Sequence, residues 1–586
     1  MKILFAASEC VPFIKTGGLA DVVGSLPVEL ARMGEDVRVM LPKYRIIDDY
    51  WKSRMEHVCD FYLIFGWAHV FCGVERVVDN GVTYYFIDNE EYFSVDNIYG
   101  DGISEGYRFA FFCRAVLEAL PRLEFYPDVL HCNDWQTGMI PALLKIQYFP
   151  DEHFRKIKTV FSVHNLKYQG LFAWKEMAGR LAIDARYYSP DYLEFYGCLS
   201  FMKGGLVFAD RILTVSPSYA EEIRTPYYGD QLDGLLRARG DSLSGILNGI
   251  DTVVYDPATD RYLDTHYDAK DLSGKAVNKQ ELQQACGLDV RPEVPVIGMI
   301  ARLTPQKGLD LIERVLDDVM QCDLQMVFLG KGDKRFVDML NWANWRYPRR
   351  LHARIALDDG LAHRIYAGAD MFLMPSQFEP CGLSQMISLR YGTVPIVRET
   401  GGLKDSIQPY NQFTDEGNGF SFANYNAHEM LDTIRRAVGY YYDDKPMWQR
   451  LVARGMACDF GWTRSAEQYR ALYWLLCPAY APAQEPAEQA APAPVEKPAP
   501  EKKPEPEKKL EPEKEPEAEK KPAPEPKKAD EPKKKPTLEE KPKPKKSEEN
   551  PYAAYAKIAE KNPHLPMGPG PVLPPKPVVK GKGKKK

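Results

Sequence analysis

The sequence predicts an α/β protein made of two doubly wound, Rossmann-like domains that face each other across a cleft, followed by a disordered C-terminal tail. Three observations support this prediction. Short apolar runs alternate with segments of helical spacing, which is typical of buried parallel strands joined by crossover helices. The pattern restarts after Asn248-Gly249-Ile250-Asp251. The composition changes abruptly at Pro478, where Pro, Lys, Glu and Ala become dominant.

The first domain is expected over residues 1–248. Residues 25–33 show helical spacing, and apolar runs predict strands at residues 3–7, 37–42, 129–131, 159–164 and 211–216. Three of these runs end in polar clusters, at residues 131–135, 164–165 and 216–218. In open parallel sheets, ligands bind outside the carboxyl ends of the strands. The clusters therefore outline one edge of the predicted cleft.

The second domain is expected over residues 249–464. Its strand candidates are residues 296–301, 325–329 and 371–375, and polar segments follow them at residues 302–308, 330–333 and 376–382. These segments predict the opposite edge of the cleft. No internal repeat of solenoid length is visible in the sequence.

The segment Lys15-Thr16-Gly17-Gly18 follows the first strand and precedes a helix. Paired glycines let backbone N–H groups approach a ligand, and a helix N-terminus offers unpaired donors with a partial positive charge. Lys15 adds a full cation. The combination suits a phosphorylated or polyhydroxylated ligand, and the alternative is a glycine turn without a ligand.

Two cations, Arg302 and Lys307, share a loop that follows a predicted strand. They are suited to holding a diphosphate leaving group, although a solvated basic loop is the alternative. Glu379 offers a carboxylate for sugar hydroxyls, and Gly382 opens a helix expected to start near Leu383. A second glycine pair, at residues 401–402, resembles the pair Gly17-Gly18.

His164 follows a strand, close to Asp134 and Lys15 in the predicted arrangement, so we interpret it as catalytic rather than structural. Cys381 lies beside Glu379 at the expected helix start, where a thiolate is favoured. We therefore expect Cys381 to be sensitive to modification, with a small packed residue as the alternative.

Several classes of site are absent from the sequence. No Asp-x-Asp pair is present, so a metal bridging a diphosphate has no obvious ligands, and we expect neither metal nor cofactor. P-loop, nucleophile-elbow and zinc-site spacings are also missing. The eleven cysteines are scattered, which fits a reducing compartment. No apolar run is long enough to span a membrane, and the first residues resemble a strand more than a signal peptide. We expect a cytoplasmic protein.

The tail, residues 478–586, has few large apolar residues and cannot bury enough surface to offset its ordering entropy. It contains 25 lysines against 19 acidic residues, whereas the whole chain carries a formal net charge of −6. Residues 1–477 are therefore clearly acidic. The tail is suited to an extended tether towards an unknown partner.

Five blocks in this order resemble the bacterial glycogen synthase and plant starch synthase family, over residues 1–476. The blocks are Lys15-Thr16-Gly17-Gly18-Leu19-Ala20-Asp21, residues 159–172 with Ser162-Val163-His164-Asn165-Leu166, Gly245-Ile246-Leu247-Asn248-Gly249-Ile250-Asp251, residues 301–308, and residues 361–370 running on to Glu379-Pro380-Cys381-Gly382-Leu383.

The resemblance implies a GT-B architecture in which the last helix, at residues 465–477, packs back on the first domain. It also implies a retaining hexosyltransferase that moves glucose from ADP-glucose, or alternatively UDP-glucose, to the non-reducing 4-OH of an α-1,4-glucan such as glycogen. The partners it implies are therefore a nucleotide sugar and a glucan. We expect no nucleic-acid partner.

The resemblance also assigns the site. Arg302 and Lys307 would hold the diphosphate, Lys15 would contact the donor, and Glu379 would bind glucose hydroxyls. The implied catalytic set is Lys15, His164, Arg302, Lys307 and Glu379. The implied substrate-binding set is Lys15, Gly18, Asp21, Asp134, Asn248, Cys381, Gly382 and Leu383.

Three positions depart from the pattern of the family. Leu357 stands where many relatives carry Tyr or Phe under the base, which leaves the ADP preference open. Tyr255-Asp256-Pro257 replaces a common Trp-Asn-Pro, and Ile387 stands where related transferases have a second Glu. Two alternatives remain. One is a catalytically inactive glucan-binding protein of the same fold, and the other is a related glycosyltransferase with another donor or acceptor.

Overall fold

The computed structural model describes residues 1–100 and 102–482. Residues 1–481 form one compact unit. The predicted disordered tail lies outside the described residues, apart from its first few positions. These positions include a short 3-10 helix, η6 (Pro478–Tyr480).

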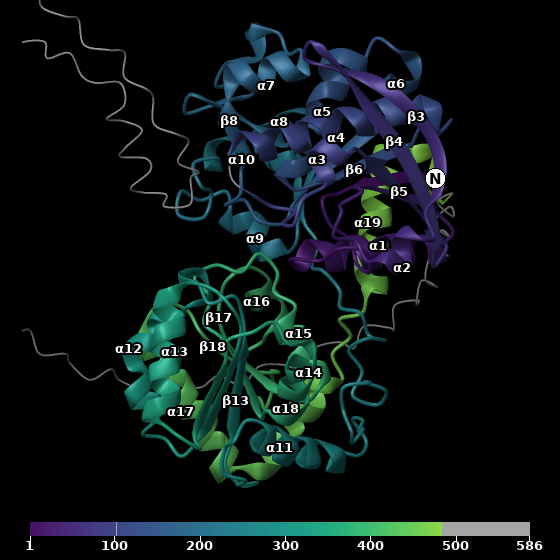
Figure 1. The fold of residues 1–586 in the computed structure, drawn as a ribbon. Helices are drawn as coiled ribbons and strands as arrows, with labels where there is room; N and C mark the ends of the chain where they lie inside the picture. The colour runs from purple at the N-terminus through teal and green to yellow at the C-terminus, as the bar shows by residue number, and fades with distance from the viewer. Residues whose placement is uncertain (101, 483–586) are drawn as a thin grey trace, which may run out of the picture. The chain divides into compact units, whose positions relative to one another are not determined.

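The first half of the chain builds a nine-stranded sheet with strand order β12-β11-β7-β6-β1-β2-β5-β4-β3 (Figure 1). Its pairs are parallel except β3 with β4 and β4 with β5, which are antiparallel. The strands are β1 (Lys2–Ala6), β2 (Asp36–Pro42), β3 (Glu56–Phe65), β4 (Ala68–Asp79), β5 (Val82–Asp88), β6 (Val129–Asn133), β7 (Lys158–Val163), β11 (Arg211–Thr214) and β12 (Leu243–Gly245).

The antiparallel strands at the edge of this sheet were not predicted, because of the residue pattern of β3. Alternate residues of β3 are exposed, so this strand has no continuous apolar run of the kind that indicates a strand buried on both faces. The five strands that were predicted in this half are present, with ends no more than two residues from those expected.

Helices and a small sheet complete the first half. The helix that follows Gly17, α1 (Gly18–Arg32), buries Leu19, Val22, Val23, Leu26 and Leu30, the spacing of one helical face. The other helices are α2 (Asp49–Lys52), α3 (Glu90–Phe93), α4 (Ile103–Arg122), α5 (Met139–Leu143), α6 (Glu152–Lys156), α7 (Trp174–Leu181), α8 (Phe201–Phe208), α9 (Pro217–Glu222) and α10 (Asp233–Ala238). The small antiparallel sheet contains β8 (Leu171–Ala173), β9 (Glu194–Phe195) and β10 (Cys198–Ser200).

The second half builds a six-stranded parallel sheet with strand order β15-β14-β13-β16-β17-β18. Its strands are β13 (Val296–Ile300), β14 (Gln325–Leu329), β15 (Leu351–Arg354), β16 (Met371–Met374), β17 (Val394–Arg398) and β18 (Phe420–Phe422). The helices are α11 (Ser273–Ala285), α12 (Leu309–Val319), α13 (Lys334–Arg346), α14 (Asp359–Gly368), α15 (Ser384–Arg390), α16 (Gly401–Ser406), α17 (Ala427–Asp443) and α18 (Lys445–Met456).

Both faces of this second sheet are covered, as a doubly wound fold requires. Side chains of α12, α13 and α17 share one core cluster with the sheet, and side chains of α11, α14 and α15 share the other. Figure 1 shows these two groups of helices on opposite sides of β13.

The last helix, α19 (Trp462–Leu476), returns to the core of the first sheet. Tyr473 is fully buried there, and its hydroxyl lies 2.7 Å from Nδ1 of His131. Nε2 of His131 lies 2.6 Å from the Ser162 hydroxyl. His131, which was expected in a polar cluster at a strand end, is therefore a buried core residue within β6.

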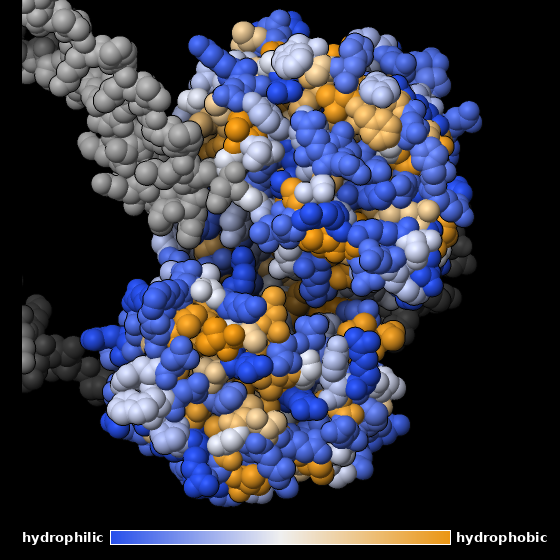
Figure 2. Space-filling model, viewed as in Figure 1, coloured by the Kyte–Doolittle hydropathy of each residue, from blue (hydrophilic) through white to orange (hydrophobic). Residues whose placement is uncertain are grey.

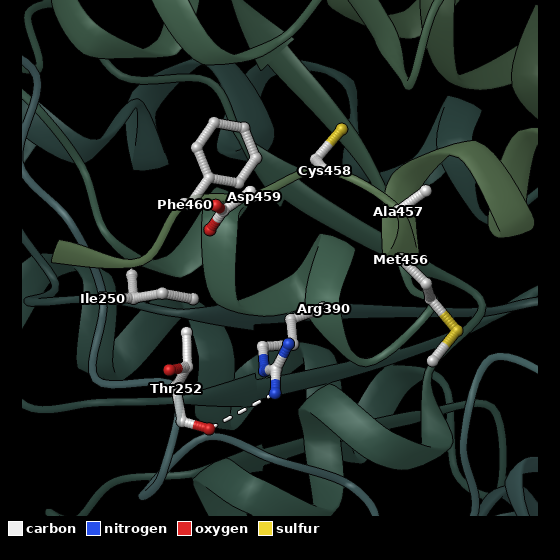
Figure 3. Close-up of a pocket in the computed structure, with 8 residues that line it drawn as sticks. All are labelled: Ile250, Thr252, Arg390, Met456, Ala457, Cys458, Asp459 and Phe460. Carbon is white, nitrogen blue, oxygen red and sulfur yellow. Dashed lines mark hydrogen bonds between the residues drawn. The ribbon is translucent and has the colours of Figure 1, made fainter. Parts of the chain in front are cut away.

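The chain crosses between the two sheets at two adjacent places. The backbone N–H of Ile250 donates to the carbonyl of Phe460 at 2.8 Å. A Cβ on Gly249 would lie 2.8 Å from Cα of Trp462, so only glycine fits there. A hollow of about 200 Å³ lies beside this crossing, and Arg390, which lines it, donates to the carbonyl of Thr252 (Figure 3). The predicted boundaries at residues 248 and 464 stay a prediction.

Candidate functional site

A buried glutamate organises the loop that carries Lys15. Glu9 is 3% exposed, and its Oε2 accepts hydrogen bonds from the N–H of Thr16 (2.5 Å), the hydroxyl of Thr16 (2.9 Å) and the N–H of Gly17 (3.2 Å). The hydroxyl of Tyr99 donates to Oε1 at 3.1 Å. Glu9 thus determines the shape of the turn before α1. Sequence reasoning missed this role, although an acid two residues after the apolar run 3–7 was a usable signal.

Lys15, Gly18 and Asp21 lie together around the start of α1, as predicted. Nζ of Lys15 lies 2.7 Å from Oδ1 of Asp21. Burial raises the pKa of Asp21, and Lys15 opposes that rise. A Cβ built on Gly18 would lie 3.9 Å from Cδ1 of Leu383, so the start of α1 closely approaches a segment of the second sheet domain.

Asp134 and His164 lie at the carboxyl ends of the neighbouring strands β6 and β7. Asp134 has a φ of 56°, uncommon for a residue other than glycine, and its Oδ1 accepts from the N–H groups of His164 (2.7 Å) and Asn165 (3.3 Å). Burial raises the pKa of Asp134 to about 7, although the two N–H donors act to lower it, and the charge of the nearby Glu9 raises it further. A carboxyl group that titrates near neutral pH is suited to holding or moving a proton.

Hydrogen bonds identify the tautomer of His164. Nδ2 of Asn133 donates to the carbonyl of Ala6 at 3.1 Å, so Oδ1 of Asn133 is free to accept. Nε2 of His164 lies 3.0 Å from that oxygen and therefore carries the proton. Burial lowers the pKa of His164 to about 3, so the ring is neutral and Nδ1 is an acceptor. An acceptor there suits a sugar hydroxyl.

Lys307 and Glu379 form an ion pair at the carboxyl end of the second sheet. Nζ of Lys307 lies 2.6 Å from Oε2 of Glu379, and the side chains are 17% and 9% exposed. The hydroxyl of Ser376 donates to the same oxygen at 2.9 Å. Within residues 1–100 and 102–482 no hydrogen bond reaches Oε1 of Glu379, which leaves that oxygen to accept from a ligand. Arg302 is exposed in the same loop as Lys307.

The start of α15 matches the predicted helix opening. Leu383 is its N-cap, and Gly382 precedes it with a φ of 74°. The positive φ favours glycine at this position, and a Cβ there would lie 2.5 Å from Oε1 of Gln385, whose side chain would have to move. Asn248, at the crossing between the sheets, is 6% exposed, and its Oδ1 has no hydrogen-bond partner among the described residues. That buried acceptor is consistent with the predicted ligand contact.

The prediction of a reactive thiolate at Cys381 is wrong. Cys381 is 6% exposed, and burial raises the pKa of its thiol to about 12. The neighbouring Glu379 carboxylate raises it further, against a hydrogen bond from the backbone of Asn248. Desolvation outweighs any effect of the helix start, so Cys381 is a small packed residue that joins Asn248 to the segment of Glu379.

The structure thus places the predicted residues in two groups. Lys15, Gly18, Asp21, Asp134 and His164 belong to the first sheet domain, and Asn248 lies at the crossing. Figure 2 shows a recess between the two halves of the molecule on the face that is drawn. Leu357 is 80% exposed. The second group comprises Arg302, Lys307, Glu379, Cys381, Gly382 and Leu383.

Residues 1–100 and 102–482 contain no group of three or more His, Cys, Asp or Glu side chains that could hold a metal ion. No helix in this part of the chain is both long and apolar enough to cross a membrane.

Two family models match this chain, one in each half. The family model for the starch synthase catalytic domain matches residues 2–238, and the model for glycosyl transferases group 1 matches residues 287–444. Glycogen synthase of Geobacillus thermodenitrificans is 54% identical over 473 residues, which is 81% of this chain and 97% of that protein. The chain belongs to the glycogen synthase family. The glycogen synthase of Clostridium novyi is 51% identical over 474 residues, which is 81% of this chain and 98% of that protein.

Solved structures place this glycogen synthase family member in the GT-B fold. The catalytic domain of starch synthase IV from Arabidopsis thaliana, bound to ADP and acarbose, superposes with a TM-score of 0.76 at 33% identity. The alignment covers 81% of this chain and 99% of that domain. The sequence resemblance is therefore confirmed, and the protein is a hexosyltransferase.

Proposed function

We propose that this chain transfers glucose from ADP-glucose, with retention of configuration, to the non-reducing 4-OH of an α-1,4-glucan such as glycogen. The buried Lys307–Glu379 pair carries the proposal, because it combines a cation for the diphosphate with a carboxylate oxygen left for the sugar. Arg302 and Lys15 add positive charge. Fixed cations stabilise the charge that develops on a departing diphosphate.

The remaining residues would act on the sugars. Oε1 of Glu379 would accept from a glucose hydroxyl, and Nδ1 of His164 would accept from another. Asp134 would hold or move a proton near neutral pH. Gly18 and Gly382 would bring backbone N–H groups to the donor, with Asp21, Asn248, Cys381 and Leu383 shaping the site around it. Retention requires the acceptor hydroxyl to arrive on the face from which the diphosphate leaves.

The identity of the base is the finer part of the proposal. Leu357 offers apolar contact but no aromatic ring, so UDP-glucose is the second candidate donor. A panel of ADP-glucose and UDP-glucose with glycogen decides between them by the diphosphate released. We expect the higher kcat/KM with ADP-glucose. An enzyme that prefers UDP-glucose would contradict this assignment.

Leu357→Tyr gives a further test of the base position. Stacking an aromatic ring on a base is worth about 1–3 kcal/mol in single-strand nucleic-acid sites, and leucine already provides part of that contact. We expect a severalfold lower KM for the donor. An unchanged KM would mean that the base lies elsewhere.

A product test separates this activity from the alternatives. Radiolabelled glucose added to glycogen should be released by an amylase specific for α-1,4 bonds, which reports both linkage and retention. Absence of diphosphate release from either donor would favour an inactive glucan-binding protein. Activity should persist in EDTA, because fixed cations take the place of a metal in the proposal.

Location and the tail are further parts of the proposal. All eleven cysteines are free thiols, which supports a reducing compartment such as the cytoplasm. We propose that residues 483–586 act as a tether and take no part in the chemistry, since every site residue lies before them. Truncation after residue 482 should leave turnover on soluble glycogen near that of the full chain.

A further inference from the structure

The two sheet domains meet through two short helices. α9 follows β11 of the first sheet, and α16 follows β17 of the second. Asp405 of α16 accepts from the N–H (2.8 Å) and the hydroxyl (2.6 Å) of Ser218 in α9. This contact joins the domains, and among the described residues no hydrogen bond of the Asp405 side chain reaches the segment that carries Glu379.

A second contact from α9 does reach that segment. Ser216 is fully buried, and its hydroxyl accepts from the N–H of Tyr219 at 3.2 Å, which caps α9. The same hydroxyl donates to the carbonyl of Pro380 at 2.6 Å. One side chain of the first domain therefore fixes both its own helix and the residue that follows Glu379.

A third contact reaches Glu379 through the first turn of α16. Oε1 of Glu222, the last residue of α9, accepts from the N–H of Gly401 (2.9 Å) and the hydroxyl of Thr400 (3.0 Å). The N–H of Gly402 in turn donates to the carbonyl of Glu379 at 3.2 Å. A carboxylate of the first domain thus holds the first turn of α16, and that turn holds Glu379.

Packing makes this connection tight. A Cβ on Gly401 would lie 2.1 Å from the carbonyl oxygen of Glu379, and one on Gly402 would lie 2.2 Å from that of Cys381. The backbone of α16 therefore rests directly on the Glu379 segment. Any shift of the first turn of α16 is transmitted to that segment, because close-packed backbone has no room to absorb it.

We propose that Ser216 and Glu222 are positioning residues through which the first domain sets the placement of the Glu379 carboxylate. The effect on catalysis rests on the proposed function, since it requires Glu379 to contact the donor sugar. In this proposal, the contact of α9 with α16 that joins the two domains also fixes the position of Glu379. The side chain of Asp405 hydrogen-bonds to Ser218 alone within residues 1–100 and 102–482, and in this proposal it holds the domains together without positioning Glu379.

Kinetics test the proposal with a matched control. Glu222→Ala and Ser216→Ala should each lower kcat about 10-fold or more while KM for glycogen changes less than twofold. Glu222→Gln keeps an oxygen to accept from Gly401 and should stay within threefold of wild type. Asp405→Ala removes two hydrogen bonds across the same boundary and should also leave kcat within threefold. Equal losses in Glu222→Ala and Asp405→Ala would overturn the proposal, because both would then act only on domain contact.

Hydrogen exchange gives a readout that does not depend on activity. Peptides covering residues 376–383 and 400–403 should exchange at least 10-fold faster in Glu222→Ala than in wild type, and at the wild-type rate in Asp405→Ala. Unchanged exchange in Glu222→Ala would refute the positioning role. A wild-type enzyme that releases no diphosphate from either donor would instead refute the proposed function, and the exchange result would still decide the positioning.

Discussion

Replacing Lys307 by alanine leaves a carboxylate without its cation. Glu379 has a side chain that is only 9% exposed, and Lys307 contributes the ion-pair partner at 2.6 Å. The hydroxyl of Ser376 would remain as a donor. Breaking a buried ion pair by removing one partner typically costs about 3–5 kcal/mol of stability, because the other charge stays buried and uncompensated. We expect the lower end of that range, since Ser376 still donates and Lys307 is itself 17% exposed.

The same substitution should affect the reaction. Losing one preorganised electrostatic contact to charge that develops in the transition state costs about 2.7–4 kcal/mol, or about 10²–10³-fold in kcat. Urea denaturation followed by tryptophan fluorescence measures the first effect. Release of diphosphate in the presence of glycogen measures the second. KM for glycogen should change little, because Lys307 lies on the donor side of the proposed site.

A surface ion pair provides the control. Arg291 donates to Asp323 at 2.8 and 2.9 Å and lies exposed, so Arg291→Ala should change neither the urea midpoint nor the turnover. A Lys307→Ala variant that keeps kcat within threefold of wild type would refute the role assigned to this cation. Loss of stability without loss of turnover would leave Lys307 with a structural role only.

Four further outcomes are expected. Because the pKa of Asp134 is raised to about 7, the wild type should lose stability relative to Asp134→Asn as pH rises from about 4 to 7. Urea midpoints measure this loss, and a difference in midpoint between the two proteins that does not change with pH would contradict it. Burial lowers the pKa of Lys275 to about 7, so stability should rise from pH 7 to 9 in wild type but less in Lys275→Met. Gly401→Ala should abolish most turnover, whereas Gly240→Ala, which has open space at its Cβ, should not. Cys381 should resist thiol reagents until the protein unfolds, so rapid labelling of the native protein that Cys381→Ser prevents would count against its burial.

Local patterns were sufficient for much of the fold. Strands buried on both faces read as short apolar runs, so β1, β13 and β16 were predicted close to their observed ends. The helix openings at Gly18 and Leu383 followed from glycine and turn chemistry that acts over a few residues. The hairpin of β3 and β4 was missed because its exposed edge lacks that apolar signal.

The site residues also divide into those that the sequence could predict and those whose roles needed the structure. Lys15, His164, Lys307 and Glu379 lie in the segments that follow strands, where the topology of a parallel sheet places functional groups, and they could be proposed from the sequence. The pairing of Lys307 with Glu379 could not be predicted, because the two residues are 72 positions apart in the sequence. The role of Glu9 likewise depends on the loop that folds over its carboxylate.

Strand positions, turns and the family motifs follow from interactions between near neighbours, and these can be recognised in the sequence. The neutral ring of His164, the raised pKa of Asp134 and the inert thiol of Cys381 follow instead from desolvation by segments far away in the chain. The contacts of Ser216 and Glu222 with the Glu379 segment are of the same kind, since they span more than 150 residues. Burial and long-range hydrogen bonds exist only once the chain has folded, and for this reason the tertiary structure alone decided them.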